Sequence, residues 1–253
     1  MVSEGFDLTL TMCLKGIDGM VLASDSRGTF GDPRGVTAQN DNMKKLYDVS
    51  KYVGVVVAGS GELGATIMDE IPNRIRSSNI EGVTPVMHEI RKILMERFDQ
   101  WFKGYSIVPI QGSTTPTRPT LLIIIGGFEV NAEGKPTVQK IYSLNCHNNF
   151  APMLHDYGYA LNGVVQYALY LLNRLYMQNL TVEKLLPLGA YNITETASQD
   201  GKVGGPVQLM KIVPNEGCVI LKTEEINRIL QDNNSRSEKL KLLFYGDEEN
   251  ARE

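Results

Sequence analysis

Two kinds of hydrophobic pattern alternate along the chain and predict its secondary structure. Alternating or continuous apolar stretches rich in β-branched residues predict strands, and apolar positions spaced by three or four predict helices. The strand segments are 8–14, 20–26, two within 44–60, 120–130, 136–144, 207–213 and 218–223. The helix segments are 63–79, 86–104, 163–178, 181–197 and 223–231.

The order of these elements predicts the fold class. Strands come in hairpins, which makes neighbouring strands antiparallel, and the helices come in pairs between the groups of strands. Helix pairs that follow hairpins pack as layers outside two sheets rather than as crossovers between parallel strands. We therefore expect an α+β fold, a four-layer αββα sandwich of two antiparallel sheets flanked by helix pairs.

Proline, glycine and polar residues set the expected boundaries. Pro72 should kink or interrupt the first helix, and Thr84 with Pro85 resembles a helix start. Polar loops are expected at 26–43, at 105–119, and around His147 and His155. The expected organisation is a leader at 1–8, one domain at 9–234 and a loose charged tail at 235–253.

The composition is that of an ordinary globular protein and excludes several classes of function. The 253 residues are 42% hydrophobic and 21% charged, with a net charge of −4. There is no basic cluster, so no nucleic-acid partner is expected. Three widely spaced cysteines predict free thiols rather than disulfides or a zinc site. Without a signal sequence or a membrane-spanning apolar run, the expected location is the cytoplasm, with no membrane partner. No metal or other cofactor is expected.

The stretch Gly59-Ser60-Gly61-Glu62-Leu63-Gly64 fits G-x-G-x-x-G between a strand and a helix. A dinucleotide site also needs a second parallel strand that ends in an acidic residue. Here another helix follows, so this interpretation is disfavoured. Two others stay open: tight packing of a strand end against a helix, and a backbone N–H that stabilises an oxyanion, which requires a nucleophile nearby.

A candidate nucleophile lies in the first strand, within a set of three segments. Thr9-Leu10-Thr11 begins that strand, Asp25-Ser26-Arg27-Gly28-Thr29 ends the next, and Lys44-Lys45-Leu46-Tyr47 follows. With VVVAGSGE at 55–62, these segments resemble those of proteasome β subunits and related N-terminal-nucleophile threonine hydrolases. The resemblance runs from about Thr9 to Val219 and implies the same four-layer sandwich.

The resemblance implies a role for each matched residue. Thr9 corresponds to the nucleophile, Asp25, Lys45 and Asp200 to its supporting residues, and Gly59 to the oxyanion donor. A threonine hydroxyl needs a base, and a freed α-amine, which titrates near ~8, can accept its proton. A nearby ammonium group such as that of Lys45 would lower the pKa of this amine.

The resemblance also implies a substrate site and partners. Thr29 corresponds to a residue that binds the substrate backbone as an added strand. The pocket for the side chain before the cut bond corresponds to small or apolar residues: Gly28, Met43, Val57, Gly61 and Ala65. The implied substrate is a peptide or an unfolded protein, and the implied assembly is a homo- or hetero-oligomeric ring, with a regulatory ATPase as a further possible partner.

Three positions depart from the family pattern. Leu8 precedes Thr9 where self-processing members have glycine, and Val203 and Asn162 stand where serines are expected. The first expectation is a threonine endopeptidase subunit, with cleavage between Leu8 and Thr9. Two alternatives stay open: a non-catalytic structural subunit that keeps its leader, and an amidohydrolase or transpeptidase on the same scaffold.

Overall fold

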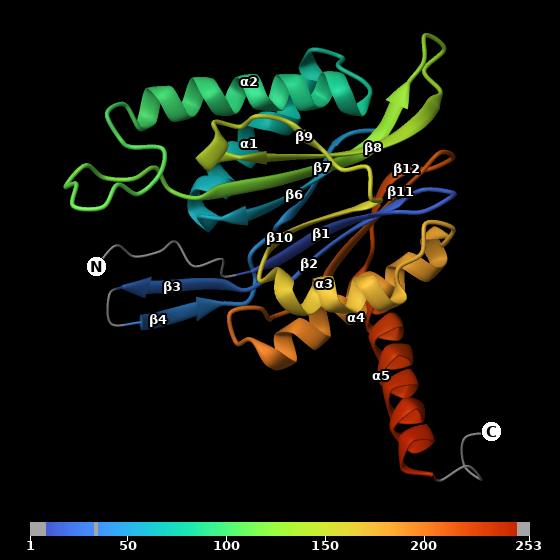
Figure 1. Ribbon diagram of the computed structural model, residues 1–253. Helices are drawn as coiled ribbons and strands as arrows, with labels where there is room; N and C mark the ends of the chain where they lie inside the picture. The colour runs from blue at the N-terminus through green and yellow to red at the C-terminus, as the bar shows by residue number, and fades with distance from the viewer. Residues whose placement is uncertain (1–8, 33–34, 247–253) are drawn as a thin grey trace.

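The computed structural model describes residues 9–32 and 35–246, and it contains two five-stranded antiparallel sheets that face each other (Figure 1). The first sheet has, in spatial order, strands β10 (Tyr159–Gly163), β1 (Leu10–Lys15), β2 (Met20–Ser24), β11 (Gln208–Val213) and β12 (Gly217–Ile220). The second has β5 (Leu46–Ser50), β6 (Val53–Gly59), β7 (Leu121–Val130), β8 (Pro136–Asn145) and β9 (Met153–Leu154).

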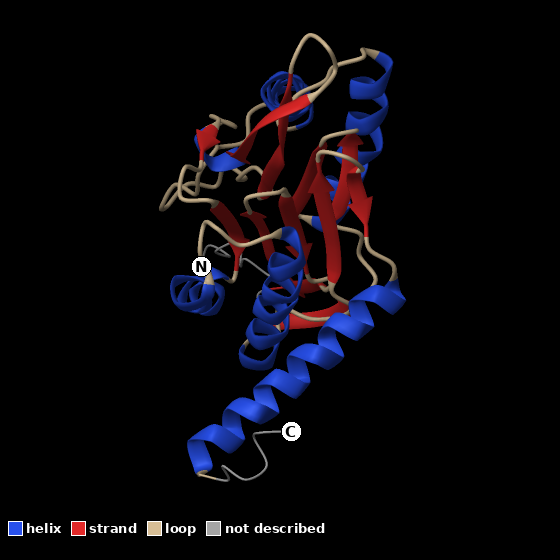
Figure 2. Cartoon of the chain, turned by 90° about the vertical axis from the view of Figure 1, so that its right-hand side faces the viewer, coloured by secondary structure: helices blue, strands red, loops and turns tan. Residues whose placement is uncertain are grey.

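Helices cover the outer faces of both sheets. Helices α1 (Gly61–Ser77) and α2 (Val83–Trp101) pack on the second sheet, while α3 (Val165–Leu175) and α4 (Val182–Gln199) pack on the first. Helix α5 (Thr223–Tyr245) begins against α4 and then extends away from the body (Figure 2). The predicted four-layer αββα sandwich is confirmed.

The central strands are buried on both faces, which explains their nearly continuous apolar sequences. All residues of β2 are buried, as are the first eight of β7. Three apolar clusters fill the spaces between layers, one under each helix pair and one between the sheets. The cluster between the sheets includes Cys13, Leu22 and Ile124. It joins the two sheets into one body, so elements from both can meet at one site.

Two details of the first helix pair differ from the prediction. Helix α1 runs through Pro72 without interruption, since Ile71 and Ile75 on either side are fully buried and hold it against the sheet. Helix α2 begins at Val83 rather than after Thr84. The Thr84 hydroxyl donates to the Glu129 carboxylate. Proline is tolerated in this first turn, where backbone N–H groups lack partners within the helix.

Two predicted loops contain strands. The segment 26–43 includes β3 (Gly28–Asp32) and β4 (Gly35–Asn40), which pair only with each other. The segment around His147 and His155 holds a 3-10 turn at Cys146–Asn148 and the short strand β9, and β10 follows it. These strands are short, irregular or at an edge, so they lack the apolar alternation that the central strands show.

The last helix is longer than its predicted end at residue 231. Helix α5 continues to Tyr245, and Gly246, with φ +83°, stops it in a left-handed conformation. Glycine is the usual residue at such a helix end. The predicted loose tail from Ser235 is therefore wrong as far as Tyr245. The predicted leader at 1–8 and the end of the tail at 247–253 lie outside the described residues.

Candidate active site

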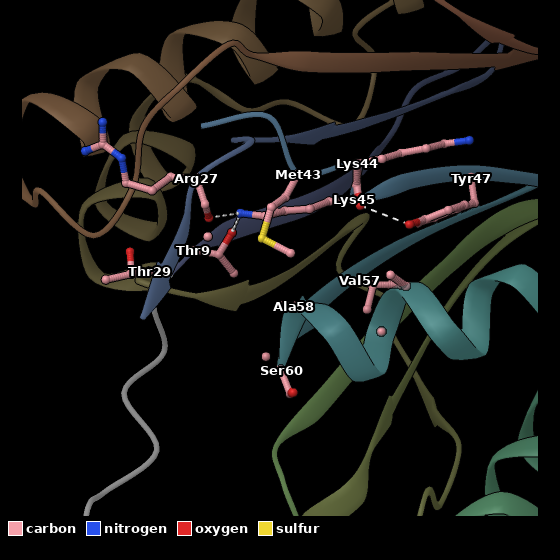
Figure 3. Close-up of a pocket in the computed structure, with 15 residues that line it drawn as sticks. Thr9, Arg27, Thr29, Met43, Lys44, Lys45, Tyr47, Val57, Ala58 and Ser60 are labelled. Carbon is pink, nitrogen blue, oxygen red and sulfur yellow. Dashed lines mark hydrogen bonds between the residues drawn. The ribbon is translucent and has the colours of Figure 1, made fainter. Parts of the chain in front are cut away.

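The pairing of β1 with β2 brings Thr9 and Asp25 together. Thr11 lies opposite Ser24 in the antiparallel register, so the residue before β1 and the residue after β2 meet at one end of the first sheet. Lys45 directly precedes β5 of the second sheet. The three side chains therefore converge at one end of the space between the two sheets (Figure 3 shows Thr9 and Lys45).

The three side chains form a direct hydrogen-bonded group. The Thr9 hydroxyl donates to Asp25 Oδ1 and accepts from Lys45 Nζ. Lys45 Nζ also lies 2.7 Å from Asp25 Oδ1 and donates to the backbone carbonyl of Arg27 over 2.6 Å. A hydroxyl between an ammonium group and a carboxylate is held in one orientation, as a nucleophile requires.

Backbone amides fix the carboxylate of Asp25. Its Oδ1 accepts from the Leu10 N–H (3.1 Å), and its Oδ2 accepts from the N–H groups of Arg27 (3.2 Å) and Gly204 (3.1 Å). These donors come from three separate segments of the chain. Asp25 is completely buried, and such bonds offset the cost of burying its charge.

Burial changes the protonation behaviour of Lys45. Its exposed fraction is 8%. Loss of solvent lowers the pKa of its ammonium group, an effect that the Asp25 carboxylate partly opposes. The neutral form of Lys45 is therefore populated at a lower pH than the neutral form of an exposed lysine.

Gly59 ends β6 in a conformation that favours glycine. Its φ is +103°, and a Cβ there would lie 2.3 Å from the carbonyl oxygen of Thr120. The Ser60 N–H donates to the same carbonyl (2.8 Å) and holds the turn into α1. This turn accounts for the first glycine of the G-x-G-x-x-G pattern and brings Gly59 into the pocket that Thr9 lines.

The pocket beside Thr9 is lined by all six residues of the predicted substrate site. It encloses about 550 Å³, its open mouth included. Its lining includes Gly28, Thr29, Met43, Val57, Gly61 and Ala65. Their part in substrate binding stays a prediction.

Met43 occupies one side of this pocket, between two glycines. A Cβ on Gly28 would lie 1.9 Å from Met43 Sδ, and one on Gly61 would lie 2.1 Å from its Cε. The missing side chains of Gly28, which lies after β2, and Gly61, which begins α1, thus leave the space that Met43 fills. Met43 is the largest apolar side chain at the pocket wall, and its thioether is flexible.

Asp200 is not placed in the pocket lining. It is the C-cap of α4, where its carboxylate accepts from the Lys202 N–H (2.9 Å). The turn that follows Asp200 leads to Gly204, whose backbone N–H donates to the Asp25 carboxylate. Any effect of Asp200 on the site acts through this turn. Val203 is buried in the apolar cluster of the first sheet. Asn162 lies opposite Thr11, and within the described part of the chain its Nδ2 and Thr11 Oγ1 have no hydrogen-bond partner.

Gln208 was not predicted, and it holds the segment that carries Lys45. Its Nε2 donates to the Met43 carbonyl (2.6 Å), and its Oε1 accepts from the Lys45 N–H (3.1 Å). The side chain, from the first strand position of β11, thus binds the backbone just before β5 in the other sheet. The only signal in the sequence is one polar residue at the start of an apolar strand, which is too weak to identify a role.

Arg27 also makes side-chain contacts that were not predicted from the sequence. Its guanidinium binds both carboxylate oxygens of Asp41, at 2.7 and 2.8 Å, and lowers the pKa of that carboxyl group. It also donates to the Gly201 carbonyl (2.9 Å). Arg27 therefore links the end of β2, the end of β4 and the turn after α4 around the site.

The described ranges offer no arrangement of three or more His, Cys, Asp or Glu side chains that could hold a metal ion. In the same ranges, no helix is both long enough and apolar enough to cross a membrane.

Comparisons with known proteins find similar sequences among proteasome subunits. The family model that describes proteasome subunits matches residues 9–127. The proteasome subunit beta of Streptomyces griseus subsp. griseus is 24% identical over 223 residues, which cover 86% of this chain and 69% of that protein. The proteasome subunit beta of Methanosphaera stadtmanae is 22% identical over 228 residues, covering 90% of this chain and 97% of that protein.

A solved structure is similar over most of its length. The Anbu (ancestral beta-subunit) from Yersinia bercovieri superimposes with a TM-score of 0.69 at 15% identity, covering 94% of this chain and 97% of the other. At this identity the likeness concerns the fold.

The fold and the site define a class of protein. Two antiparallel sheets between helix pairs, with a threonine directly before β1, are the fold of N-terminal-nucleophile hydrolases. Within that class the chain is similar to proteasome subunits in its sequence over residues 9–127 and to an ancestral beta-subunit in its fold.

Proposed function

We propose that the chain is a threonine-type endopeptidase subunit in which Thr9, freed by cleavage after Leu8, is the nucleophile. The observation that carries the proposal is the contact of the Thr9 hydroxyl with both Lys45 Nζ and the Asp25 carboxylate beside an open pocket. Leu8 lies outside the described residues, so the cleavage itself is part of the proposal.

The proposed reaction uses the freed α-amine of Thr9 as the base. The Oγ1 proton passes to this amine, Oγ1 attacks the scissile carbonyl carbon, and the oxyanion forms beside the Gly59 backbone N–H. The leaving amine takes the proton as the C–N bond breaks, which leaves an ester on Thr9. Water then cleaves the ester, releasing the acid and restoring the hydroxyl. Lys45 would assist by keeping the pKa of the α-amine low through like charge.

The pocket supports a preference for an apolar side chain before the cut bond. Its wall combines Met43, Val57 and Ala65 with glycines, and its lining contains no acidic side chain among the described residues. Thr29 lies in β3, and we propose that the substrate backbone pairs with this strand. The substrate class is therefore an extended peptide or an unfolded protein.

The proposed assembly is a ring of like subunits, as the likeness to proteasome subunits suggests, with a regulatory ATPase as an optional partner. The proposed location is the cytoplasm. Three cysteines without disulfides, two of them buried, are compatible with a reducing compartment.

One specific observation favours the alternative of a non-catalytic subunit. Val203 and Asn162 replace expected serines, and Asn162 Nδ2 is buried without a partner within the described ranges. A hydroxyl that would help to position the α-amine is missing at both positions. A subunit that retains its leader and shapes an assembly is the second candidate function.

Intact-mass measurement and an active-site probe separate the two candidates. The endopeptidase should lose residues 1–8 and bind a peptide epoxyketone, which needs both the hydroxyl and the free amine of Thr9. Thr9→Ala should keep the leader and cleave no peptide, while Thr66→Ala, an exposed threonine on α1, should behave like the wild type. Full-length mass together with no labelling would favour the non-catalytic subunit. Peptide cleavage by Thr9→Ala would show that the nucleophile is another residue.

A further inference from the structure

The residue before β7 supports the turn that carries Gly59, the proposed oxyanion donor. The Thr120 carbonyl accepts from the Ser60 N–H over 2.8 Å, and a Cβ on Gly59 would lie 2.3 Å from the same oxygen. Thr120 therefore contacts both residues of the turn through its backbone. A shift of Thr120 would move the Gly59 N–H relative to Thr9, beside which the proposed oxyanion forms.

The Gly59 N–H points to the side of β6 on which Lys45 lies. On that side, the Val57 N–H donates to the Lys45 carbonyl over 3.0 Å. N–H groups two residues apart on a strand point to the same side. Strand β5 begins only at Leu46, so it does not extend far enough to offer the Gly59 N–H a carbonyl. This donor is therefore available for an oxyanion as long as the turn holds it in place.

Two consecutive residues of the 3-10 turn Cys146–Asn148 hold the start of β7. Cys146 Sγ accepts from the Leu121 N–H over 3.2 Å. His147 Nε2 lies 3.2 Å from the Thr120 hydroxyl, at hydrogen-bond distance. The turn thus binds the start of β7 through the backbone of Leu121 and through the side chain of Thr120, which precedes it.

This 3-10 turn is anchored to the core under α2, so it can serve as a fixed support. The Asn145 side chain caps the turn by accepting from the His147 N–H over 2.8 Å. Phe150, which follows the turn, is fully buried, and its ring centre lies 4.8 Å from that of Phe98 in α2. Arg91 Nε of the same helix donates to the Phe150 carbonyl over 3.0 Å. The His147 ring therefore extends from a rigid base.

The second ring nitrogen of His147 binds the loop 105–119. His147 Nδ1 lies 3.1 Å from the Ile107 carbonyl oxygen. A carbonyl oxygen only accepts hydrogen bonds, so Nδ1 carries the proton and donates it. In the neutral ring, Nε2 is then the acceptor for the Thr120 hydroxyl. One rigid ring thus connects this loop to the residue that supports the Gly59 turn.

We propose that His147 is a positioning residue of the proposed hydrolysis: by holding the Thr120 hydroxyl, it keeps the Gly59 turn in place. The inference rests on the proposed function and adds a residue to it. His147 is not among the residues that line the pocket, so it acts through Thr120 and not on the substrate. Its bond to the Ile107 carbonyl fixes the ring. A positioning group is effective only when its own orientation is fixed in this way.

Substitution of Thr120 tests the hydroxyl through which His147 acts. Thr120→Val keeps the shape and removes the hydroxyl, so kcat should fall by roughly tenfold, because a small misplacement of a reacting group is costly. KM should change little, since the pocket is intact. Thr120→Ser keeps the hydroxyl and should restore kcat. His155→Asn is the matched control, because this partly buried histidine binds the Ser143 hydroxyl (2.8 Å) elsewhere on the same sheet. Wild-type kcat in Thr120→Val would overturn the proposal.

Two substitutions of His147 separate its two contacts. The amide of Gln lies near the position of the histidine Nε2 and that of Asn near the position of Nδ1. His147→Gln should therefore keep the Thr120 contact and kcat, whereas His147→Asn should keep only the Ile107 contact and lose about tenfold in kcat. His147→Asn combined with Thr120→Val should lose no more than either change alone, because both break the same bond. Equal kcat in the Gln and Asn variants would assign His147 to stability alone.

Hydrogen exchange resolved to single amides measures the same coupling without hydrolysis. The Ser60 amide, which is bonded to the Thr120 carbonyl, should exchange faster in His147→Asn than in the wild type. The Val57 amide, which is bonded to the Lys45 carbonyl, should not change. Unchanged exchange at Ser60 would overturn the inference even if the wild type cleaves peptides. Faster exchange in a protein that cleaves no peptide would support the coupling and contradict only the proposed hydrolysis.

Discussion

Lys45 is a cation buried between two sheets, and its environment makes a prediction about pH. Burial lowers the pKa of the folded-state ammonium below the ordinary lysine value of 10.5. Between the lowered pKa and this ordinary value, the unfolded chain binds a proton that the folded chain has lost. The free energy of unfolding should therefore rise with pH through this window as far as Lys45 contributes.

Lys45→Met tests both the predicted pH dependence of the free energy of unfolding and the proposed role of Lys45 in peptide cleavage. The difference in unfolding free energy between wild type and variant, measured by urea denaturation from neutral pH up to the ordinary lysine pKa, should shift in favour of the wild type as pH rises. Peptidase activity should fall by about tenfold or more, because without the neighbouring charge the α-amine of Thr9, with an ordinary pKa of ~8, is largely protonated at neutral pH and cannot act as the base. Lys92→Met, at an exposed position of α2 away from the pocket, should leave both quantities near the wild-type values. A pH-independent difference would show that Lys45 is not desolvated as its burial indicates.

Gln208 supports the site through the backbone on both sides of Lys44. Gln208→Leu removes the partners of the Met43 carbonyl and the Lys45 N–H. Each buried group left unpaired costs about 1–3 kcal/mol. We expect lower stability in urea and a decrease of about tenfold in kcat, which corresponds to about 1.4 kcal/mol.

Gln208→Glu separates the two hydrogen bonds. A carboxylate keeps the acceptor for the Lys45 N–H and loses the donor for the Met43 carbonyl. Because Lys45 carries the proposed chemistry and Met43 lines the pocket, this variant should raise KM more than it lowers kcat. Equal losses in both variants, with no separation of kcat from KM, would mean that Gln208 matters only for stability.

At the scale of elements, the turn from β6 into α1 depends on Gly59. Gly59→Ala places a Cβ 2.3 Å from the Thr120 carbonyl oxygen at a φ of +103°. Such backbone strain costs about 2 kcal/mol or more. We expect a loss of stability of this size by urea denaturation, and a loss of activity because the turn faces Thr9. Gly201→Ala is the matched control, since its φ is not positive and a Cβ there meets open space. Equal tolerance of both substitutions would show that the turn can relax.

The elements that could be predicted are those that bury a regular apolar pattern. The strand over 120–130 and the helices over 163–178 and 181–197 were confirmed, with boundaries shifted by a few residues. The hairpin β3–β4 was missed because its short strands pair only with each other and carry no apolar alternation. The length of α5 was missed because its second half leaves the body, where burial no longer sets the sequence pattern.

The site could be predicted only in part, for a physical reason. Thr9, Asp25 and Lys45 were proposed from resemblance, and the structure brings them into contact. Hairpin pairing explains why the first two meet, but Lys45 comes from the other sheet. Gln208 acts across both sheets through a side-chain amide, and no local pattern encodes such a contact. Asp200 was also proposed, and the structure holds it at the end of α4 instead.

At the scale of the whole molecule, the cluster between the sheets should determine global stability, and Cys13 reports on it. Cys13 is completely buried, and burial raises the pKa of its thiol, so it should react only when the sheets separate. Leu22, fully buried in the same cluster, packs at the centre of the two-sheet body. Leu22→Ala should lower the free energy of unfolding by about 2–5 kcal/mol. Ile17→Ala, at a position 64% exposed, is the matched control and should have little effect.

The rate of Cys13 modification by a thiol reagent then distinguishes global from local opening. If the sheets separate only on complete unfolding, Leu22→Ala should accelerate labelling of Cys13 by the factor that its loss of stability predicts, roughly 30-fold for about 2 kcal/mol. Labelling is measured by mass spectrometry of the peptide that contains Cys13. Cys146, which is buried between the second sheet and helices α1 and α2, serves as an internal reference. Acceleration at Cys13 alone would mean that the sheets open without unfolding of the outer layer. Because Lys45 and Thr9 come from opposite sheets, such an opening would also disassemble the site in part of the folded population.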